Sequence, residues 1–111
     1  MICDIKGIRN TELLNRIDQV RFILNVICEK SEFTVLDVIE HQFEPEGFSI
    51  LYLLSESHIS IHTFPERQYF ALDIYTCREY DNNDIYNEIY EYLVGIFDAK
   101  LEKPTIIDRW F

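Results

Sequence analysis

Residues 48–76 read FSILYLLSESHISIHTFPERQYFALDIYT, three apolar segments with only short polar interruptions between them. Residues 48–54 are apolar enough for a central strand, and residues 57–63 and 69–76 predict two further strands. The proline in the interruption at 65–68 supports a turn there. Connections this short favour antiparallel pairing, because neighbouring parallel strands need a long crossover between them.

The flanking residues predict two strands before this stretch and one after it. Residues 2–7 are short and extended, and residues 33–43 are rich in valine and isoleucine. The sequence EPEG at 44–47 is a turn signal that separates this second strand from the third. Pro104 opens a final predicted strand through Ile106 and Ile107.

Two helices are predicted from apolar residues that recur at intervals of three and four. The first stripe, with Asn10 or Thr11 as a possible cap, consists of Leu13, Ile17, Val20, Leu24 and Ile27. The second stripe, with Asn82, Asn83 or Asp84 as a possible cap, consists of Ile85, Ile89, Leu93 and Ile96.

This order of elements predicts an α+β fold, a two-layer sandwich of a mostly antiparallel sheet with two helices on one face. A chain of 111 residues has room for one modest core, so residues 1–111 are expected to form a single domain. The second face of the sheet also needs cover, and we expect a partner subunit in a dimer to supply it.

Composition excludes several classes of protein. The formal charge is -10, from 20 acidic and 10 basic residues, which disfavours a nucleic-acid partner because phosphate would be repelled. No apolar run approaches the roughly 18–20 residues that cross a bilayer, and no signal peptide is visible after Met1. Cys3, Cys28 and Cys77 are odd in number and far apart, which favours reduced thiols and a cytoplasmic location.

Polar groups are unusually dense in residues 55–66, SESHISIHTFPE, although the isoleucines there alternate as in a strand. Such groups are costly on a half-buried strand unless they have partners, so this segment is a candidate for chemistry. Serine and histidine on a strand can also simply form hydrogen bonds along an edge. Zinc binding by His58 and His62, with Cys77 or His41, is conceivable, but no close cysteine pair supports it and no metal is expected.

The segment from Gly47 to Cys77 closely resembles the self-cleavage region of the bacterial and archaeal S-adenosylmethionine decarboxylases. The resemblance implies that the bond between Glu56 and Ser57 breaks autocatalytically, giving chains 1–56 and 57–111. The serine then becomes a covalent pyruvoyl group, an electron sink that makes an external cofactor unnecessary.

Three further residues take roles from the same resemblance. His62 is implied to be the base of the cleavage reaction, and Ser49 to assist the rearrangement. Cys77, at the end of the next strand, is implied to protonate the product of decarboxylation. Periodicity alone does not bring these groups together, because Ser57 and His62 are five residues apart and face opposite sides of a straight strand. Either the strand kinks near Ser57, or the serine lies in a turn before the strand.

The resemblance also implies a substrate and its contacts. Phe43 and Phe64 would stack on the adenine of S-adenosylmethionine, and Glu66 would hold the ribose hydroxyls. Phe64 replaces the tryptophan usual in the bacterial branch, and Arg78 stands where glycine is common, as does Ile50 after Ser49.

The function expected from these residues is decarboxylation of S-adenosylmethionine to the aminopropyl donor for spermidine synthesis, by a homodimer with active sites at its interface. The alternatives are the same chemistry on ornithine or arginine, and an unprocessed, non-catalytic homologue that binds a partner.

Overall fold

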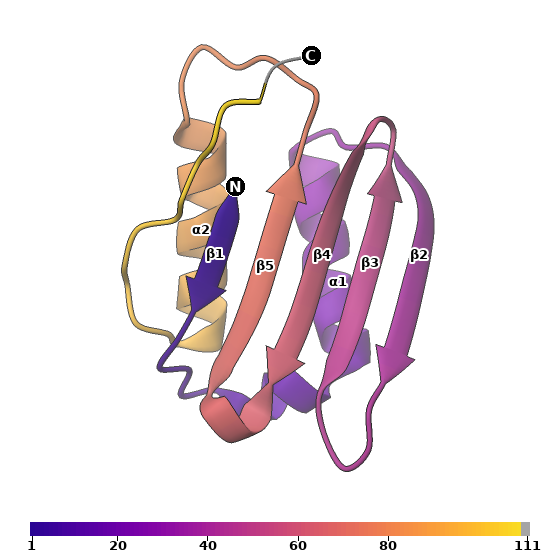
Figure 1. Ribbon diagram of the computed structural model, residues 1–111, viewed down its shortest axis with the longest axis vertical. Helices are drawn as coiled ribbons and strands as arrows, with labels where there is room; N and C mark the ends of the chain where they lie inside the picture. Colours follow the sequence, from indigo (N-terminus) through magenta and orange to yellow (C-terminus); the bar gives the residue numbers. More distant parts are fainter. Residues whose placement is uncertain (110–111) are drawn as a thin grey trace.

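Five antiparallel strands form one sheet, and both long helices cover the same face of it (Figure 1). The structure is a computed structural model that describes residues 1–109, so the last two residues of the expected chain 57–111 lie outside the described residues. The strands are β1 (Ile2–Ile5), β2 (Val35–Gln42), β3 (Phe48–Leu54), β4 (Ser57–Phe64) and β5 (Tyr69–Tyr75). Their order in the sheet is β1-β5-β4-β3-β2. The prediction of an α+β two-layer fold is confirmed.

The core lies between the inner face of the sheet and the helices α1 (Ile17–Lys30) and α2 (Asp84–Phe97). Burial alternates strictly along β3 and β4, as expected for strands with one covered face. The helix stripes are confirmed where they meet this face, with Val20, Leu24 and Leu93 almost fully buried. Within residues 1–109, neither helix is both long and apolar enough to span a membrane.

Two predicted elements differ from the structure. The first helix is divided, because Arg16 has a non-helical backbone (φ -106, ψ 75) and separates the 3-10 helix η1 (Thr11–Asn15) from α1. The prediction of a final strand at 104–107 is wrong, since the only pairing of these residues within the described part of the chain is one bridge between Thr105 and Ile2. Pro104 has no N–H to extend a ladder, and the segment lies along the short edge strand β1.

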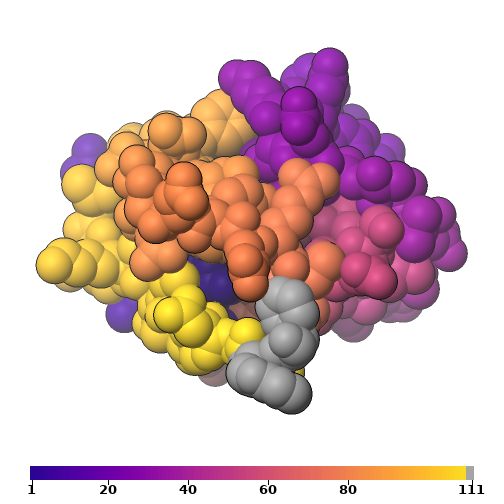
Figure 2. Space-filling view, turned by 90° about the horizontal axis from the view of Figure 1, so that it is seen from above, coloured from indigo at the N-terminus to yellow at the C-terminus, as the bar shows by residue number. Residues whose placement is uncertain are grey.

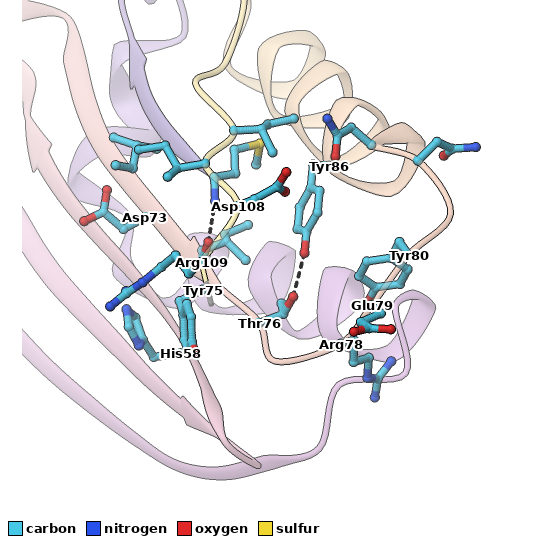
Figure 3. A pocket seen from close by; sticks show the side chains of 17 residues that line it. His58, Asp73, Tyr75, Thr76, Arg78, Glu79, Tyr80, Tyr86, Asp108 and Arg109 are labelled. Atoms are coloured by element: carbon cyan, nitrogen blue, oxygen red, sulfur yellow. Dashed lines mark hydrogen bonds between the residues drawn. The ribbon is translucent and has the colours of Figure 1, made fainter. Parts of the chain in front are cut away.

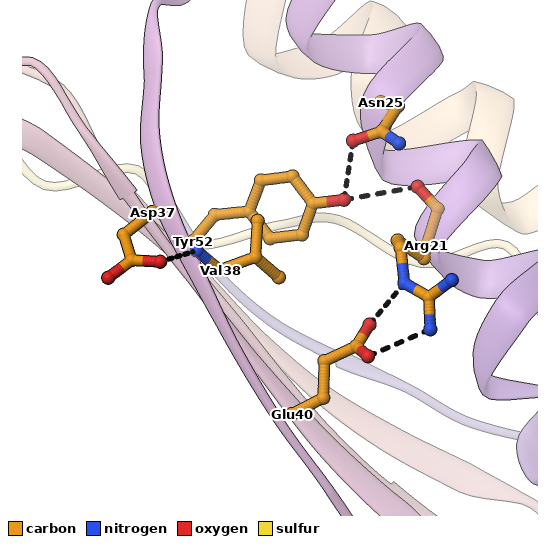
Figure 4. Close-up of polar contacts among 6 residues, drawn as sticks. All are labelled: Arg21, Asn25, Asp37, Val38, Glu40 and Tyr52. Atoms are coloured by element: carbon orange, nitrogen blue, oxygen red, sulfur yellow. Dashed lines mark hydrogen bonds and ion pairs between the residues drawn. The ribbon is translucent and has the colours of Figure 1, made fainter.

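A polar cluster on α1 holds the other edge of the sheet (Figure 4). Arg21 binds the carboxylate of Glu40 on β2 through two nitrogens, in a bidentate ion pair. The buried hydroxyl of Tyr52 donates to Asn25 Oδ1 at 2.6 Å, and its burial raises the pKa of Tyr52 to about 12. These contacts fix β2 and β3 against α1, although most β2 side chains are exposed.

The part of the outer face formed by β2 and β3 carries exposed apolar side chains and is uncovered in the single chain. Its exposed side chains include Leu36 and Ile39 on β2, at 60% and 62% relative exposure, and Leu51 and Leu53 on β3, at 43% and 54%. Contiguous exposed apolar surface of this kind marks an interaction site on a soluble protein.

Candidate active site

The connection between β3 and β4 is a two-residue turn at Ser55 and Glu56. Glu56 adopts a left-handed backbone conformation with φ 58, immediately before Ser57. A side chain in this conformation costs about 1–2 kcal/mol, because its Cβ crowds the following carbonyl oxygen. The strain therefore sits at the bond that the sequence marks for cleavage.

Ser57 is the first residue of β4 and points inward, with 9% relative exposure. Its Oγ accepts a hydrogen bond of 3.2 Å from the backbone N–H of Cys77, just beyond β5. Cys77 Sγ lies 3.9 Å from the same Oγ and 3.5 Å from Glu56 Oε2. The fold thus brings Cys77 to Ser57 and Glu56, which lie 20 and 21 positions before it in the chain.

Ser49 and His62 form a second pair on the outer face. They are cross-strand partners on β3 and β4, and Ser49 Oγ lies 2.6 Å from His62 Nδ1. His41 on β2 is the other cross-strand neighbour of Ser49 and is also exposed. This hydrogen bond orients the imidazole of His62 toward the open face of the sheet.

The two groups do not meet within one chain. Ser57 begins β4 and faces the helices, whereas His62 lies five residues further on and faces outward. Five residues of strand span roughly 16 Å, so the pairs occupy opposite ends as well as opposite faces. The second geometry expected from the sequence, a serine within a turn, is wrong, because Ser57 is the first residue of β4 and follows the turn at Ser55 and Glu56. Ser57 does not meet His62.

The three residues expected to bind substrate lie at the His62 end of the sheet. Phe43 is 47% exposed and meets the His41 ring edge-on at a centroid distance of 4.5 Å. Phe64 is 37% exposed and stacks on Tyr69 at 5.5 Å. Glu66 lies in the 3-10 helix η2 (Pro65–Arg67) that follows.

Gly47 shapes this end of the sheet. Its carbonyl accepts the N–H of Phe43 at 2.9 Å, and its φ is +87. A Cβ at this position would lie 2.9 Å from the carbonyl oxygen of Thr63, too close for any other residue without a shift of the backbone. The position therefore requires glycine.

The other histidines and thiols considered from the sequence lie apart from the Ser57 site. Within residues 1–109, no group of three or more His, Cys, Asp or Glu side chains is arranged to hold a metal ion. His58 faces outward and packs against Tyr75, with ring centroids 5.6 Å apart. Burial raises the pKa of the Cys3 thiol to about 12 and that of Cys28 to about 11, so both thiols are unreactive.

A cavity of about 640 Å³ lies beside the strand end that carries Cys77. The segment after β5 and the carboxyl-terminal segment border it, with the amino terminus between them (Figure 2). Thr76 and Tyr86 point toward each other across it, with their hydroxyl oxygens 2.5 Å apart (Figure 3). The Tyr80 hydroxyl is buried here without a hydrogen-bond partner in the described part of the chain.

Sequence reasoning missed these cavity residues. Tyr80 and Tyr86 lie close to Cys77 in the sequence, which was the one indication that they border its site. Closeness in sequence does not reveal how α2 packs against the end of β5.

Comparison with known proteins gives one consistent result. The family model described as S-adenosylmethionine decarboxylase matches residues 1–109. An S-adenosylmethionine decarboxylase proenzyme from Hydrogenobaculum is 38% identical over 109 residues, covering 98% of this chain and 78% of that protein. One from Brevibacillus brevis is 48% identical over 68 residues, covering 61% of this chain and about half (51%) of that protein.

The structural comparison agrees with the sequence matches. The crystal structure of the adenosylmethionine decarboxylase from Aquifex aeolicus is similar to this chain with a TM-score of 0.75 and 25% identity. The match covers 99% of this chain and 92% of that one. Together with the family match over residues 1–109, this shows that the chain belongs to the S-adenosylmethionine decarboxylase family.

Proposed function

We propose that this chain cleaves itself between Glu56 and Ser57 and then decarboxylates S-adenosylmethionine. The observation that carries the proposal is the contact of Ser57 with Cys77 beside the left-handed Glu56, in a member of this family. The pyruvoyl group generated from Ser57 would supply an electron sink for the electron pair left on the α-carbon when carbon dioxide departs, so no separate cofactor is needed.

Cleavage begins at the Ser57 hydroxyl. Its oxygen attacks the carbonyl carbon of Glu56, forming a C–O bond as the C–N bond breaks and the freed amine takes the proton. Removal of the Ser57 α-proton then expels the new α-carboxylate of Glu56, which keeps the ester oxygen and ends the chain 1–56. The dehydroalanine left at position 57 hydrolyses to pyruvoyl and ammonia. The N–H of Cys77 holds the attacking oxygen, and the left-handed Glu56 raises the energy of the uncut bond.

The proposed base, His62, does not share the face of its own chain that carries Ser57. His62 is oriented by Ser49 but lies on the outer face. Two copies packed through their outer faces, with strands running in opposite directions, would bring the His62 end of one copy to the strand end at which Ser57 of the other begins β4. We therefore propose a homodimer in which each site combines Ser57 of one copy with His62 and Ser49 of its partner.

Cys77 is the proposed proton donor after cleavage. Its Sγ is the side-chain group nearest to Ser57 Oγ among the contacts of that residue, at 3.9 Å. A donor at this position can protonate the former carboxyl-bearing carbon only if it is held beside Ser57. In the uncut chain the hydrogen bond from Cys77 N–H to Ser57 Oγ holds the two residues together, and this oxygen leaves with Glu56 on cleavage.

The proposed substrate contacts are Phe43, Phe64 and Glu66, which lie at the same end as His62 and so would come from the partner copy. Both phenylalanines are partly exposed and can offer a face to a flat base. The proposed product is the aminopropyl donor for spermidine synthesis. A cytoplasmic location, consistent with the free thiols Cys3, Cys28 and Cys77, belongs to the same proposal.

The proposal is tested by measuring release of labelled carbon dioxide from carboxyl-labelled S-adenosylmethionine, ornithine and arginine. Purified wild-type protein is compared with Ser57→Ala as the matched inactive control. We expect release from S-adenosylmethionine alone, and only with the wild-type protein. Release from ornithine or arginine instead would assign a different substrate, and equal rates with the two proteins would overturn the role of Ser57.

A further inference from the structure

Arg78, the residue after Cys77, ties the segment that carries the proposed proton donor to the end of α1. One terminal nitrogen of its guanidinium donates to the carbonyl oxygen of Ser31 at 2.8 Å, and the other donates to that of Glu32. The same group lies over the ring of Phe33, 5.3 Å from its centroid. A planar fork of donors can satisfy these three contacts together, whereas a lysine ammonium cannot.

The end of α1 is built to receive such a group. Phe33 N–H donates to Cys28 O at 2.8 Å and Glu32 N–H donates to Glu29 O at 3.2 Å, with Glu32 left-handed at φ 58. This is the Schellman pattern of a helix end, which leaves the next carbonyls, those of Ser31 and Glu32, free to accept from elsewhere. The helix dipole also favours a cation at this terminus.

The same connection between α1 and β2 holds the other side of the cleavage site. The carbonyl of Thr34 accepts the N–H of Ser55 at 3.0 Å, one residue before Glu56. Residues 31–34 therefore contact both the turn that contains the bond to be cut and the residue after Cys77. The hydrogen bond from Cys77 N–H to Ser57 Oγ closes the ring of contacts.

We propose that Arg78 is a positioning residue that acts through Cys77, holding its N–H and thiol against Ser57. The inference rests on the proposed function, because it assigns a role in the reactions at Ser57. Glycine, which is common at this position in the family pattern, could make none of the three contacts. This restraint is therefore a feature of this chain and not of the cleavage motif itself.

The test compares Arg78→Met and Arg78→Lys with Arg21→Met as a matched control. Arg21 also joins α1 to another element, but its partner Glu40 lies on β2 and not at the cleavage site. Two rates are measured: cleavage of the newly folded chain, and alkylation of Cys77 by iodoacetamide in a Ser57→Ala background. The melting temperature of each variant reports general loss of stability.

We expect Arg78→Met to slow cleavage about threefold to tenfold and to speed alkylation of Cys77 by a similar factor, because small displacements of a reacting group are costly. Both rates of Arg78→Lys should lie between those of the wild type and of Arg78→Met, because lysine keeps the positive charge but lacks the planar set of donors. Arg21→Met should lower the melting temperature without changing either rate.

Wild-type rates in Arg78→Met would overturn the inference, as would equal slowing by Arg21→Met. A wild-type chain that stays uncut would overturn the proposed function instead. The alkylation rates of Cys77 would then still decide whether Arg78 holds that residue.

Discussion

Ser57 and His62 occupy the same strand, but Ser57 faces the helices and His62 faces the open side of the sheet. A strand shows successive side chains to opposite faces, so residues five apart cannot share one. The hydrogen bonds confirm the separation: Ser57 is bound to Cys77 and His62 to Ser49. In the proposed homodimer, His62 would reach Ser57 from a second copy of the chain.

We expect two inactive variants to restore cleavage in each other when they form a mixed dimer. His62→Ala retains Ser57, and Ser57→Ala supplies the missing histidine from across the interface. Alone, His62→Ala should cleave roughly a hundredfold more slowly or worse, the usual loss of a general base. Co-expression with two different tags, tandem purification and mass analysis of each copy would measure this.

In the mixed dimer, the His62→Ala copy should be cut and the Ser57→Ala copy should stay whole. His41→Ala, which removes another outward histidine from the same row of the sheet, serves as the control and should cleave normally. An uncut mixed dimer of the correct mass would contradict the shared site and place the base within its own chain.

The backbone strain at Glu56 predicts an order of cleavage rates. Glu56→Ala keeps a side chain at φ 58, whereas Glu56→Gly relieves the strain because glycine adopts this conformation freely. We expect the alanine variant to cleave about 5–30 times faster than the glycine variant, the ratio that corresponds to 1–2 kcal/mol. Time courses of cleavage after rapid refolding would measure both rates. Faster cleavage of the glycine variant would show that the strain does not drive the reaction.

The three thiols should react in a defined order. At pH 8, Cys3 and Cys28 would be thiolate to about 0.1% or less, given pKa values of about 12 and 11, so iodoacetamide should modify the partly exposed Cys77 first. Modification should stop turnover and leave the two cleaved chains unchanged. Cys77→Ala is the control: it should cleave normally and turn over poorly, or protonate the wrong atom. Loss of turnover that follows modification of Cys3 or Cys28 would contradict the assignment.

The same raised pKa values predict how stability depends on pH. The folded chain holds the thiol protons of Cys3 and Cys28 more tightly than the unfolded chain, whose thiols titrate near 9.0. Their contribution is therefore fully present below pH 9 and is lost as the pH rises toward 11 and 12. Urea unfolding between pH 8 and 11 should give a falling free energy, and Cys3→Ala should flatten the curve.

Thr63 should be the most sensitive polar residue of the core. It is 5% exposed, and its hydroxyl donates to Leu14 O at 2.8 Å and accepts Phe48 N–H at 2.9 Å. Thr63→Val keeps the shape but leaves that N–H unpaired, at a cost of about 1–3 kcal/mol in the free energy of unfolding. Denaturation in a Ser57→Ala background would measure it. Thr105→Val, at an exposed threonine, is the control. An equal loss of unfolding free energy in both variants would contradict this role of Thr63.

Much of the fold could be predicted from local patterns in the chain. The alternation in residues 57–63 and the spacing from Val20 to Leu24 each bury one face, so strand and helix follow directly. The absence of a final strand could not be predicted. Pro104 and Ile106 lie at an edge of the sheet, and within the described residues the pairing of this segment is the single bridge of Thr105 with Ile2. Pairing at an edge depends on the tertiary arrangement, which local patterns do not contain.

The motif named Ser57, His62 and Cys77 as candidate site residues, and their roles stay predictions. Periodicity already placed the first two on opposite faces, as the structure does. The contacts of Arg78 with Ser31 and Glu32 join positions 46 and 47 apart, which no local pattern reveals.

The measurement that tests the central claim most directly is the intact mass of the purified protein under denaturing conditions. Self-cleavage predicts two chains, residues 1–56 and residues 57–111, with the second beginning in a pyruvoyl group instead of serine. Ser57→Ala, purified in parallel, should remain whole. A wild-type preparation that stays a single chain of 111 residues for days would contradict the account.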